Sequence, residues 1–131
     1  MNAKQGEVEK WVSKAEEDRF AVVSLFKLEG RPASVVCFHA QQCAEKYLKA
    51  LLIHGEVNFG RTHDLLELVG RLPATAEPAE GFVDAMRVLN AFSVLPRYPD
   101  WEPSESDISA AVEAMELARS FVRKQLGLPP D

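Results

Sequence analysis

The amino-acid sequence predicts an all-α protein, an up-and-down four-helix bundle with an additional short helix. Apolar residues recur at steps of three and four along four long segments, which is the period of an amphipathic helix. Prolines and glycines separate these segments, and no stretch alternates between apolar and polar residues as a half-buried strand does. Long helices joined by short connections form antiparallel bundles. The 131 residues are expected to form one domain, residues 1–131.

Residues 32–55 are expected to form the helix around which the others pack. One apolar stripe runs through Val36, Ala40, Cys43, Tyr47 and Leu51, and a second through Phe38, Leu48 and Leu52. The second stripe is interrupted by Gln41, Gln42 and Glu45. A helix that is apolar around most of its circumference lies between other helices. Its end is predicted at Gly55, in a left-handed cap.

The first helix is predicted over residues 7–28. Its apolar stripe consists of Val8, Trp11, Ala15, Val22 and Leu25. Asp18 falls on the same stripe, and a carboxylate at a core-facing position requires a partner. This leaves two interpretations of Asp18: a hydrogen-bonded structural residue or a ligand-binding residue.

A short helix is predicted over residues 63–72, with Thr62 as its N-cap. His63 and Asp64 are adjacent, so on a helix they point in different directions, and we expect His63 to pack or cap rather than to form a catalytic pair. The fourth helix is predicted over residues 78–95. Its buried face is expected to consist of Phe82, Met86, Leu89 and Phe92.

The fifth helix is predicted to begin after Ser104, because Ser104 and Asp107 have the spacing of a capping box. Its apolar stripe consists of Ile108, Ala111, Met115, Ala118 and Val122. Arg119, Arg123 and Lys124 lie where the helix dipole favours cations. Gly127 is expected to end the helix.

The loop at residues 96–103 has more features of a binding site than any other segment. It contains three prolines, which stiffen it, and the side chains of Arg97, Tyr98, Asp100, Trp101 and Glu102. One interpretation is a ligand-binding loop. In the other, Tyr98 and Trp101 cover the end of the bundle and Arg97 pairs with a carboxylate.

Composition narrows the classes of partner. The net charge is −5, which argues against a protein that wraps duplex DNA. A small basic site for one nucleotide or an RNA strand is compatible with this charge, with Lys10, Arg19, Lys46 and Lys49 as its candidates. The first residues lack the apolar stretch of a secretion signal, and no apolar run reaches the ~18 residues of a membrane span, so no membrane association is expected.

The two cysteines and three histidines have no metal-ligand spacing, so neither a metal nor a cofactor is predicted. Cys37 and Cys43 lie on different faces of one helix and cannot form a disulfide. A chain of this kind is expected in the reducing cytoplasm.

Four motifs give the sequence a resemblance to the HEPN family of prokaryotic helical domains. The first is Trp-x3-Ala-x2-Asp, from Trp11 to Asp18. The second is the block Ala40-Gln41-Gln42-x-Ala44-Glu45-Lys46-x-Leu48-Lys49-Ala50-Leu51. The others are His63-Asp64-Leu65 and Arg97-Tyr98-Pro99. The motifs occur in the order and spacing of the family and span nearly the whole chain.

The resemblance implies a helical bundle that dimerises and is often encoded beside a minimal nucleotidyltransferase, as a toxin–antitoxin-like pair. Many members are metal-independent ribonucleases with an arginine followed, after four to six residues, by a histidine. Arg97 matches that arginine, but Glu102, Pro103 and Ser104 stand where the histidine would be. Metal-free cleavage needs a general base and acid, and Glu102 would serve only if burial raised its pKa.

The sequence therefore favours a non-catalytic module that binds a nucleotide or RNA phosphate, or a nucleotidyltransferase chain. Its predicted ligand-binding residues are Arg97, Tyr98, Asp100, Glu45, Lys46 and Asp18. The alternatives are a ribonuclease toxin that uses Arg97 and Glu102, and a purely structural dimeric module. A homodimer is expected because the apolar residues of the central and fourth helices, with Phe38, Phe92 and Val94 as candidates, exceed what one small bundle is expected to cover.

Overall fold

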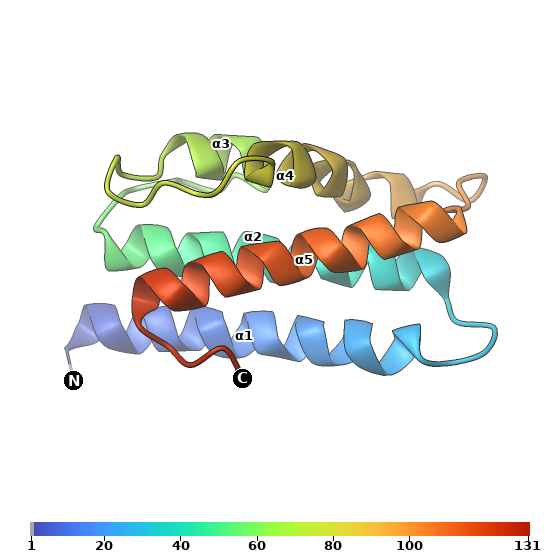
Figure 1. The fold of residues 1–131 in the computed structure, drawn as a ribbon, viewed down its shortest axis with the longest axis horizontal. Coiled ribbons are helices and arrows are strands. Elements are labelled where there is room, and N and C mark those ends of the chain that lie inside the picture. The colour runs from blue at the N-terminus through green and yellow to red at the C-terminus, as the bar shows by residue number, and fades with distance from the viewer. Residues whose placement is uncertain (1) are drawn as a thin grey trace.

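The computed structural model describes residues 2–131, and its regular elements within that range are all helical (Figure 1). They are α1 (Ala3–Phe26), α2 (Ala33–His54), α3 (Leu65–Gly70), α4 (Phe82–Asn90), the 3-10 turns η1 (Ala91–Ser93) and η2 (Leu95–Arg97), and α5 (Glu105–Leu126). The predicted all-α class is confirmed.

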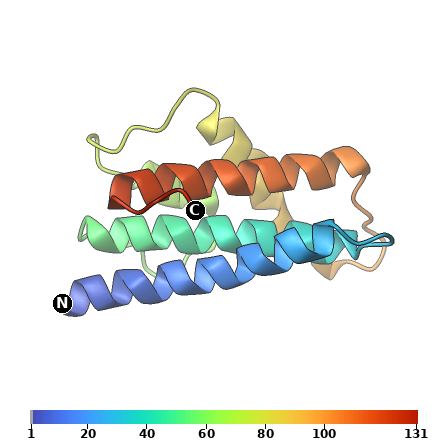
Figure 2. The same cartoon turned by 60° about the horizontal axis from the view of Figure 1, so that its bottom comes forward.

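The helices run up and down around α2. The α1 and α2 helices are antiparallel neighbours, and α5 packs on α2 from a second side (Figures 1 and 2). On the side away from α1, α3 and α4 follow one another and cover α2 and α5. The α2 helix thus contacts every other helix, as expected for the central element.

The α2 helix is the most buried helix of the bundle. Thirteen of its 22 residues are buried, against four in α1 and eight in α5. Both predicted stripes face the core, except that Phe38 is only half-buried. Each fully buried aliphatic side chain contributes on the order of 2 kcal/mol, so this helix supplies much of the hydrophobic stabilisation. Three of its buried residues are polar: Gln41, Glu45 and Lys49.

Capping residues set the ends of the two outer long helices. The Asn2 side chain accepts a hydrogen bond from Gln5 N at 2.8 Å, so α1 begins four residues earlier than predicted. The Ser104 side chain accepts from Asp107 N at 3.1 Å and Asp107 accepts from Ser104 N at 2.8 Å, which confirms the capping box. Gly127 has a φ of 72°, the left-handed conformation predicted for the end of α5.

The end of α2 differs from the prediction in its left-handed residue. Gly55 has a φ of −84°, and Glu56 instead has a φ of 59°. Val57 N donates to Leu52 O at 2.9 Å, and Glu56 N donates to Ile53 O at 3.0 Å. These two bonds close a Schellman motif one residue later than expected, and that geometry requires positive φ at Glu56.

The short helix α3 begins at Leu65, and its N-cap is Asp64 rather than Thr62. The Asp64 side chain accepts hydrogen bonds from Leu66 N and Glu67 N, and Asp64 has the extended backbone of an N-cap. Thr62 instead accepts a hydrogen bond from Asp64 N at 3.0 Å and so shapes the turn before the helix.

The fourth helix is shorter than predicted. Gly81, with a φ of 89°, precedes Phe82 and leaves Pro78 in the preceding loop. After Asn90 the chain tightens into two 3-10 turns. Pro96 cannot donate the hydrogen bond to the carbonyl of residue 92 that a continuing α-helix requires, so an α-helix cannot continue regularly through this position.

Phe92, one of the expected interface residues, lies in the core instead. It is 4% exposed and packs with the buried residues of the bundle, so it leaves no apolar surface for a partner. Its ring lies 5.6 Å from that of Trp101, which covers it. Val94, another of these candidates, is half exposed.

Cys37 and Cys43 are free thiols buried in α2. Burial, aided by the charge of Asp107, raises the pKa of Cys37 to about 12. Burial likewise raises the pKa of Cys43, with Asp18 and Glu16 contributing. Both thiols are therefore protonated and unreactive in the folded protein at neutral pH.

Candidate functional site

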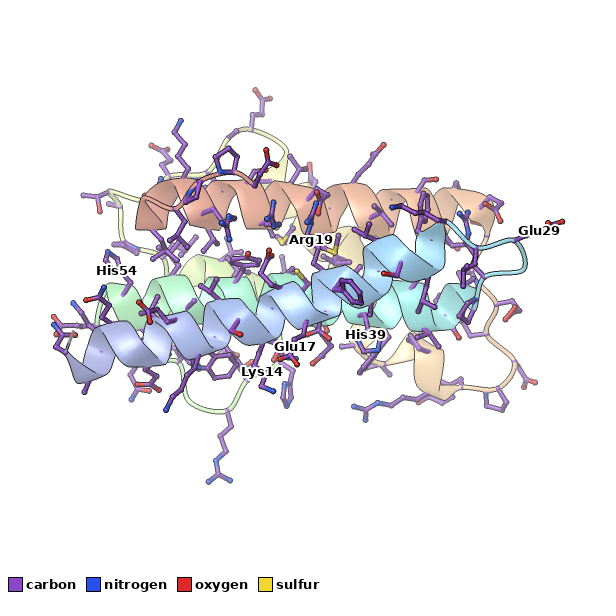
Figure 3. All side chains as sticks on the ribbon, turned by 90° about the horizontal axis from the view of Figure 1, so that it is seen from below. Lys14, Glu17, Arg19, Glu29, His39 and His54 are labelled. Atoms are coloured by element: carbon purple, nitrogen blue, oxygen red, sulfur yellow. The ribbon has the colours of Figure 1, made fainter. Side chains whose placement is uncertain are left out.

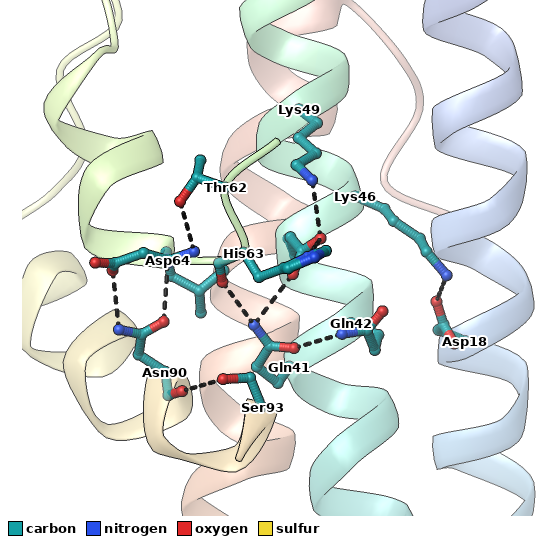
Figure 4. A network of polar contacts seen from close by, with 12 residues as sticks. Asp18, Gln41, Gln42, Lys46, Lys49, Thr62, His63, Asp64, Asn90 and Ser93 are labelled. Carbon is teal, nitrogen blue, oxygen red and sulfur yellow. Dashed lines mark hydrogen bonds and ion pairs between the residues drawn. The ribbon is translucent and has the colours of Figure 1, made fainter. Parts of the chain in front are cut away.

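Asp18 of α1 contacts two side chains of α2, those of His39 and Lys46. Its Oδ1 lies 2.7 Å from His39 Nδ1, and its Oδ2 accepts from Lys46 Nζ at 2.6 Å (Figure 4 shows the Lys46 contact). Asp18 is 7% exposed, so the two contacts satisfy a carboxylate that is nearly buried. The partner that the sequence required for Asp18 is therefore present, on the neighbouring helix.

The contact with Asp18 fixes the role of each nitrogen of His39. Because a carboxylate only accepts hydrogen bonds, Nδ1 carries the proton. In the neutral ring Nε2 is then the lone-pair nitrogen, and within residues 2–131 it has no hydrogen-bond partner. The His39 side chain is one third exposed and lies on the same edge of the α1–α2 pair as Lys14 and Glu17 (Figure 3). This arrangement can take up a proton from a bound molecule.

A second cluster is built around Glu45, further along α2. Its Oε2 lies 3.0 Å from Lys49 Nζ and 3.1 Å from His63 Nδ1, and its Oε1 accepts from Gln41 Nε2 at 3.4 Å (Figure 4). Glu45 and Lys49 are both buried, whereas the His63 side chain is 73% exposed. The cluster ties α2 to the loop before α3, because Gln41 also donates to the backbone oxygen of His63.

Lys49 is enclosed by aromatic rings as well as by Glu45. Its Nζ lies 5.4 Å from the ring centre of Trp11 and 5.5 Å from that of Phe59. A cation close to two aromatic rings is further stabilised there. Lys49 is thus a paired internal residue and not part of an open basic site, which corrects its place among the basic candidates.

His63 and Asp64 do not form a pair with one another. His63 contacts Glu45, whereas Asp64 caps α3 and accepts a hydrogen bond from Asn90 Nδ2 at 3.0 Å. Asn90 in turn accepts from Leu65 N at 2.8 Å (Figure 4). The two residues thus form no pair with one another, but His63, expected to pack or cap, instead lies largely exposed against Glu45, and Asp64 is the cap.

The loop at residues 96–103 contains Arg97, the last residue of η2, and continues to the residue before Ser104, the N-cap of α5. Arg97, Tyr98, Asp100 and Glu102 are all exposed, Tyr98 at 59%. Within residues 2–131 the Arg97 guanidinium has neither a hydrogen bond nor an ion pair. The alternative in which Arg97 pairs with a carboxylate is therefore wrong. Of the two aromatic residues in that alternative, Trp101 packs against the core and Tyr98 does not. Glu102, the residue expected to replace the histidine, is exposed to solvent rather than buried.

The η2 turn packs next to α2, the helix that carries His39 and Lys46. Sequence analysis missed His39, although a signal was available. His39, Gln42 and Lys46 are separated by three and four residues and so share one face of the helix. A polar stripe along an otherwise apolar central helix indicated that this face is not simply core.

The described part of the chain, residues 2–131, contains neither a metal-site arrangement nor a membrane-spanning helix. No group of three or more His, Cys, Asp or Glu side chains there could hold a metal ion. None of the described helices combines the length and apolar character that crossing a bilayer requires.

The chain is thus an all-α bundle whose central helix has a polar, partly buried face, and known proteins are similar to it in sequence and fold. The family model described as "HEPN domain" matches residues 8–125. The chain is 26% identical over 138 residues to a Methanocaldococcus jannaschii protein named "Putative toxin MJ1304", with 90% of each chain covered.

Two crystal structures are similar in fold. One is TT1696 from Thermus thermophilus, at 30% identity and a TM-score of 0.72, covering 91% of this chain and 98% of the other. The second is ST0689, described as an archaeal HEPN homologue, at 24% identity and a TM-score of 0.66, covering 92% and 98%. The chain belongs to the HEPN family.

Proposed function

We propose that this protein is a HEPN-type binding module in a toxin–antitoxin-like pair and that it binds the phosphate of a nucleotide or RNA strand through Arg97. The observation that carries the proposal is the exposed Arg97 guanidinium, which has no partner among the described residues. A guanidinium offers phosphate two parallel hydrogen bonds, which an ammonium cannot reproduce. The toxin name of the relative supports the wider setting.

Most other arginines of the chain are already engaged. Six of them hydrogen-bond within the protein: Arg19, Arg31, Arg71, Arg87, Arg119 and Arg123. Arg61 is the other exposed arginine without such a bond, but it lies in the loop before α3. Pro96 and Pro99 flank Arg97 and limit the freedom of its backbone, so less entropy is lost on binding.

The polar face of α2 is the proposed second part of the site. Lys46 contributes a half-buried positive charge, and Tyr98 and Asp100 stand beside Arg97 for contacts to a sugar or base. Asp18 and Glu45 have their carboxylate oxygens bound to side chains of the protein. Their proposed role is to hold Lys46, His39 and His63 in position.

The test is a titration of wild type, Arg97→Ala and Arg61→Ala with fluorescent nucleotides and short RNA. The two variants lose the same charge from exposed positions, so Arg61→Ala controls for net charge. We expect at least a tenfold loss of affinity in Arg97→Ala and little change in Arg61→Ala. Equal affinities in both variants would remove Arg97 from the site.

Two macromolecular partners are also proposed, a second copy of the chain and a minimal nucleotidyltransferase. Large apolar side chains remain exposed towards the α1–α2 connection, with Phe20 at 75%, Leu28 at 54% and Val35 at 40%. A stable interface buries upwards of ~1,000 Å² in total, and this surface is a candidate. Light scattering that detects only a 14.6 kDa species at micromolar concentration would exclude the homodimer.

A second candidate function is metal-independent RNA cleavage, favoured by the contact between Asp18 and His39. The open Nε2 of His39 can act as the base that the Arg97 motif lacks. In EDTA, cleavage that is retained by wild type and lost in His39→Gln would support this function. Intact RNA after incubation with a folded, RNA-binding wild type would reject it and leave the binding module.

A further inference from the structure

Residues 128–131 fold back along α5, on the side of the bundle where Arg119 of α5 contacts Glu16 of α1. After Gly127 the chain reverses, and Leu128 N donates to Arg123 O at 2.8 Å. Figures 1 and 2 show the segment running from the end of α5 back towards the middle of the bundle. The segment therefore occupies a surface that the helices would otherwise leave open.

Two buried arginines of α5 bind the backbone of this segment. Arg123 Nε donates to Pro129 O at 2.6 Å, and Arg119 Nη1 donates to Pro130 O at 2.7 Å. Arg119 is 5% exposed and Arg123 is 9% exposed. Hydrogen bonds from charged donors are stronger than those between neutral groups, so two of them on adjacent main-chain carbonyls indicate a groove that recognises peptide backbone.

A network below the segment fixes both arginines. Arg119 forms a bidentate pair with Glu16, with N–O distances of 2.9 and 3.0 Å. Tyr47 OH donates to Glu16 at 2.5 Å and accepts from Arg123 Nη1 at 3.1 Å. Glu16 and Tyr47 hold both arginines through contacts that do not involve the segment, which limits the side-chain entropy lost on binding.

The network carries one more positive than negative charge. Arg119 and Arg123 face the single carboxylate of Glu16, and the Tyr47 phenol is neutral. The neighbouring Arg19 and Glu116 neutralise one another. The carbonyl dipoles of Pro129 and Pro130 compensate the surplus in part. The next residue in the sequence, Asp131, is acidic and so has the charge that favours this surface.

An apolar groove of about 380 Å³ continues from the segment towards the start of α1. Its apolar lining comes from Val8, Val12, Leu126 and Leu128. Leu128 stands at its wall and remains 36% exposed, so it leaves the groove unfilled. A volume of this size accommodates a larger side chain than leucine.

We propose that this groove is a docking site for an extended peptide in which a bulky apolar residue precedes two prolines and an acidic residue. Residues 128–131 occupy the site within the same chain and show its chemistry. The two prolines pre-form an extended backbone with accessible carbonyls, the geometry that peptide-binding grooves use. The proposal is independent of phosphate binding by Arg97.

A peptide from a partner has to compete with the attached segment. A tethered segment has an effective concentration on the order of millimolar. A free peptide therefore has to displace a competitor that is present at about that concentration. The partner gains its advantage by filling the groove more fully, so we expect phenylalanine or tryptophan at the position of Leu128. Weakening the attached segment should strengthen binding of a free peptide.

The experiment titrates full-length protein with a fluorescent peptide of sequence Gly-Trp-Pro-Pro-Asp. Leu128→Ser removes the apolar anchor of the attached segment and should tighten peptide binding at least fivefold relative to wild type. Leu117→Ser removes a half-exposed leucine elsewhere on α5 and should leave affinity unchanged. Leu128→Trp should fill the groove, raise the melting temperature and weaken peptide binding.

Arg123→Gln tests the polar half of the site in the Leu128→Ser background. We expect the double variant to bind the peptide at least tenfold more weakly than Leu128→Ser alone and to keep its helical circular dichroism. The proposal is overturned if the peptide binds wild type and Leu128→Ser equally, or if neither binds it up to about 1 mM, the scale of the tethered competitor. A lower melting temperature in Leu128→Trp also contradicts it.

Discussion

Asp18 and His39, 21 residues apart in the chain, are joined across the α1–α2 contact by a distance of 2.7 Å between Oδ1 and Nδ1. The same carboxylate holds Lys46, so one acidic residue of α1 orients two side chains of α2. This makes the position of His39 and Lys46 depend on a single residue.

Replacing Asp18 by alanine should lower the free energy of unfolding by about 1–3 kcal/mol, because Lys46 and His39 lose the acceptor for their hydrogen bonds. Urea unfolding measures the change. Glu17→Ala is the matched control, since Glu17 is an exposed acid at the preceding position whose pair with Lys14 contributes under about 1 kcal/mol. Similar losses in both variants would contradict a special role for Asp18.

The capping box at the start of α5 gives a second prediction. Ser104→Ala removes the acceptor for Asp107 N and should cost about 1 kcal/mol of stability. Ser109→Ala, at an exposed position within the same helix, should be neutral or slightly stabilising because alanine favours helix. Comparing the melting temperatures of both variants with that of wild type distinguishes the loss of the capping hydrogen bond from the effect of replacing a serine by alanine.

The stability of the Glu16 network should depend on pH. Burial alone would raise the pKa of Glu16, but hydrogen bonds from Arg119 and Tyr47 and the charges of Arg119 and Arg123 lower it overall. A carboxyl whose folded pKa is lowered contributes stability above its unfolded pKa of about 4.3, and that contribution disappears as pH falls through the folded value.

Wild type should therefore lose more stability than Glu16→Gln when pH is lowered from 7 to below about 4. Urea midpoints at the two pH values give the comparison, and the other carboxyl groups cancel because both proteins share them. Parallel losses in the two proteins would show that Glu16 is not coupled to the arginines.

The Tyr47 phenol is a spectroscopic probe of the same network. Burial and the hydrogen bond to Glu16 raise its pKa to about 12, so its stabilising neutral form is fully present below the unfolded pKa of about 10 and is lost as pH rises towards 12. Tyr98→Phe leaves Tyr47 as the only tyrosine. Phenolate absorbance should appear near pH 12 in the folded variant, as the pKa requires, and near pH 10 in urea.

The sequence was most informative where the determining contacts are local. The positions of α2 and α5 follow from apolar stripes and from Pro32, Ser104 and Gly127, all of which act within one turn. The late start of α4 was missed because the helix begins after Gly81, which is in a left-handed conformation, and not at Pro78. The choice of Asp64 as a cap was also missed, because Asn90, distant in sequence, supports it.

The candidate site was harder to predict because its pairs join different helices. Asp18 was correctly assigned a need for a partner, but periodicity on α1 does not reveal that His39 and Lys46 supply it. Arg119 and Arg123 were expected to interact with the helix dipole at the end of α5, and they are instead buried under residues 128–131. Such contacts are set by tertiary packing rather than by sequence spacing.

The rate at which the two thiols of α2 are modified reports how often the bundle opens. Cys37 and Cys43 have no solvent exposure, so an alkylating reagent reaches them only when α2 separates from its neighbours. If both thiols are modified at one common rate, the bundle opens as a unit. If Cys37 reacts first, the end of α2 near residue 33 opens independently, and mass spectrometry of the labelled peptides distinguishes the two cases.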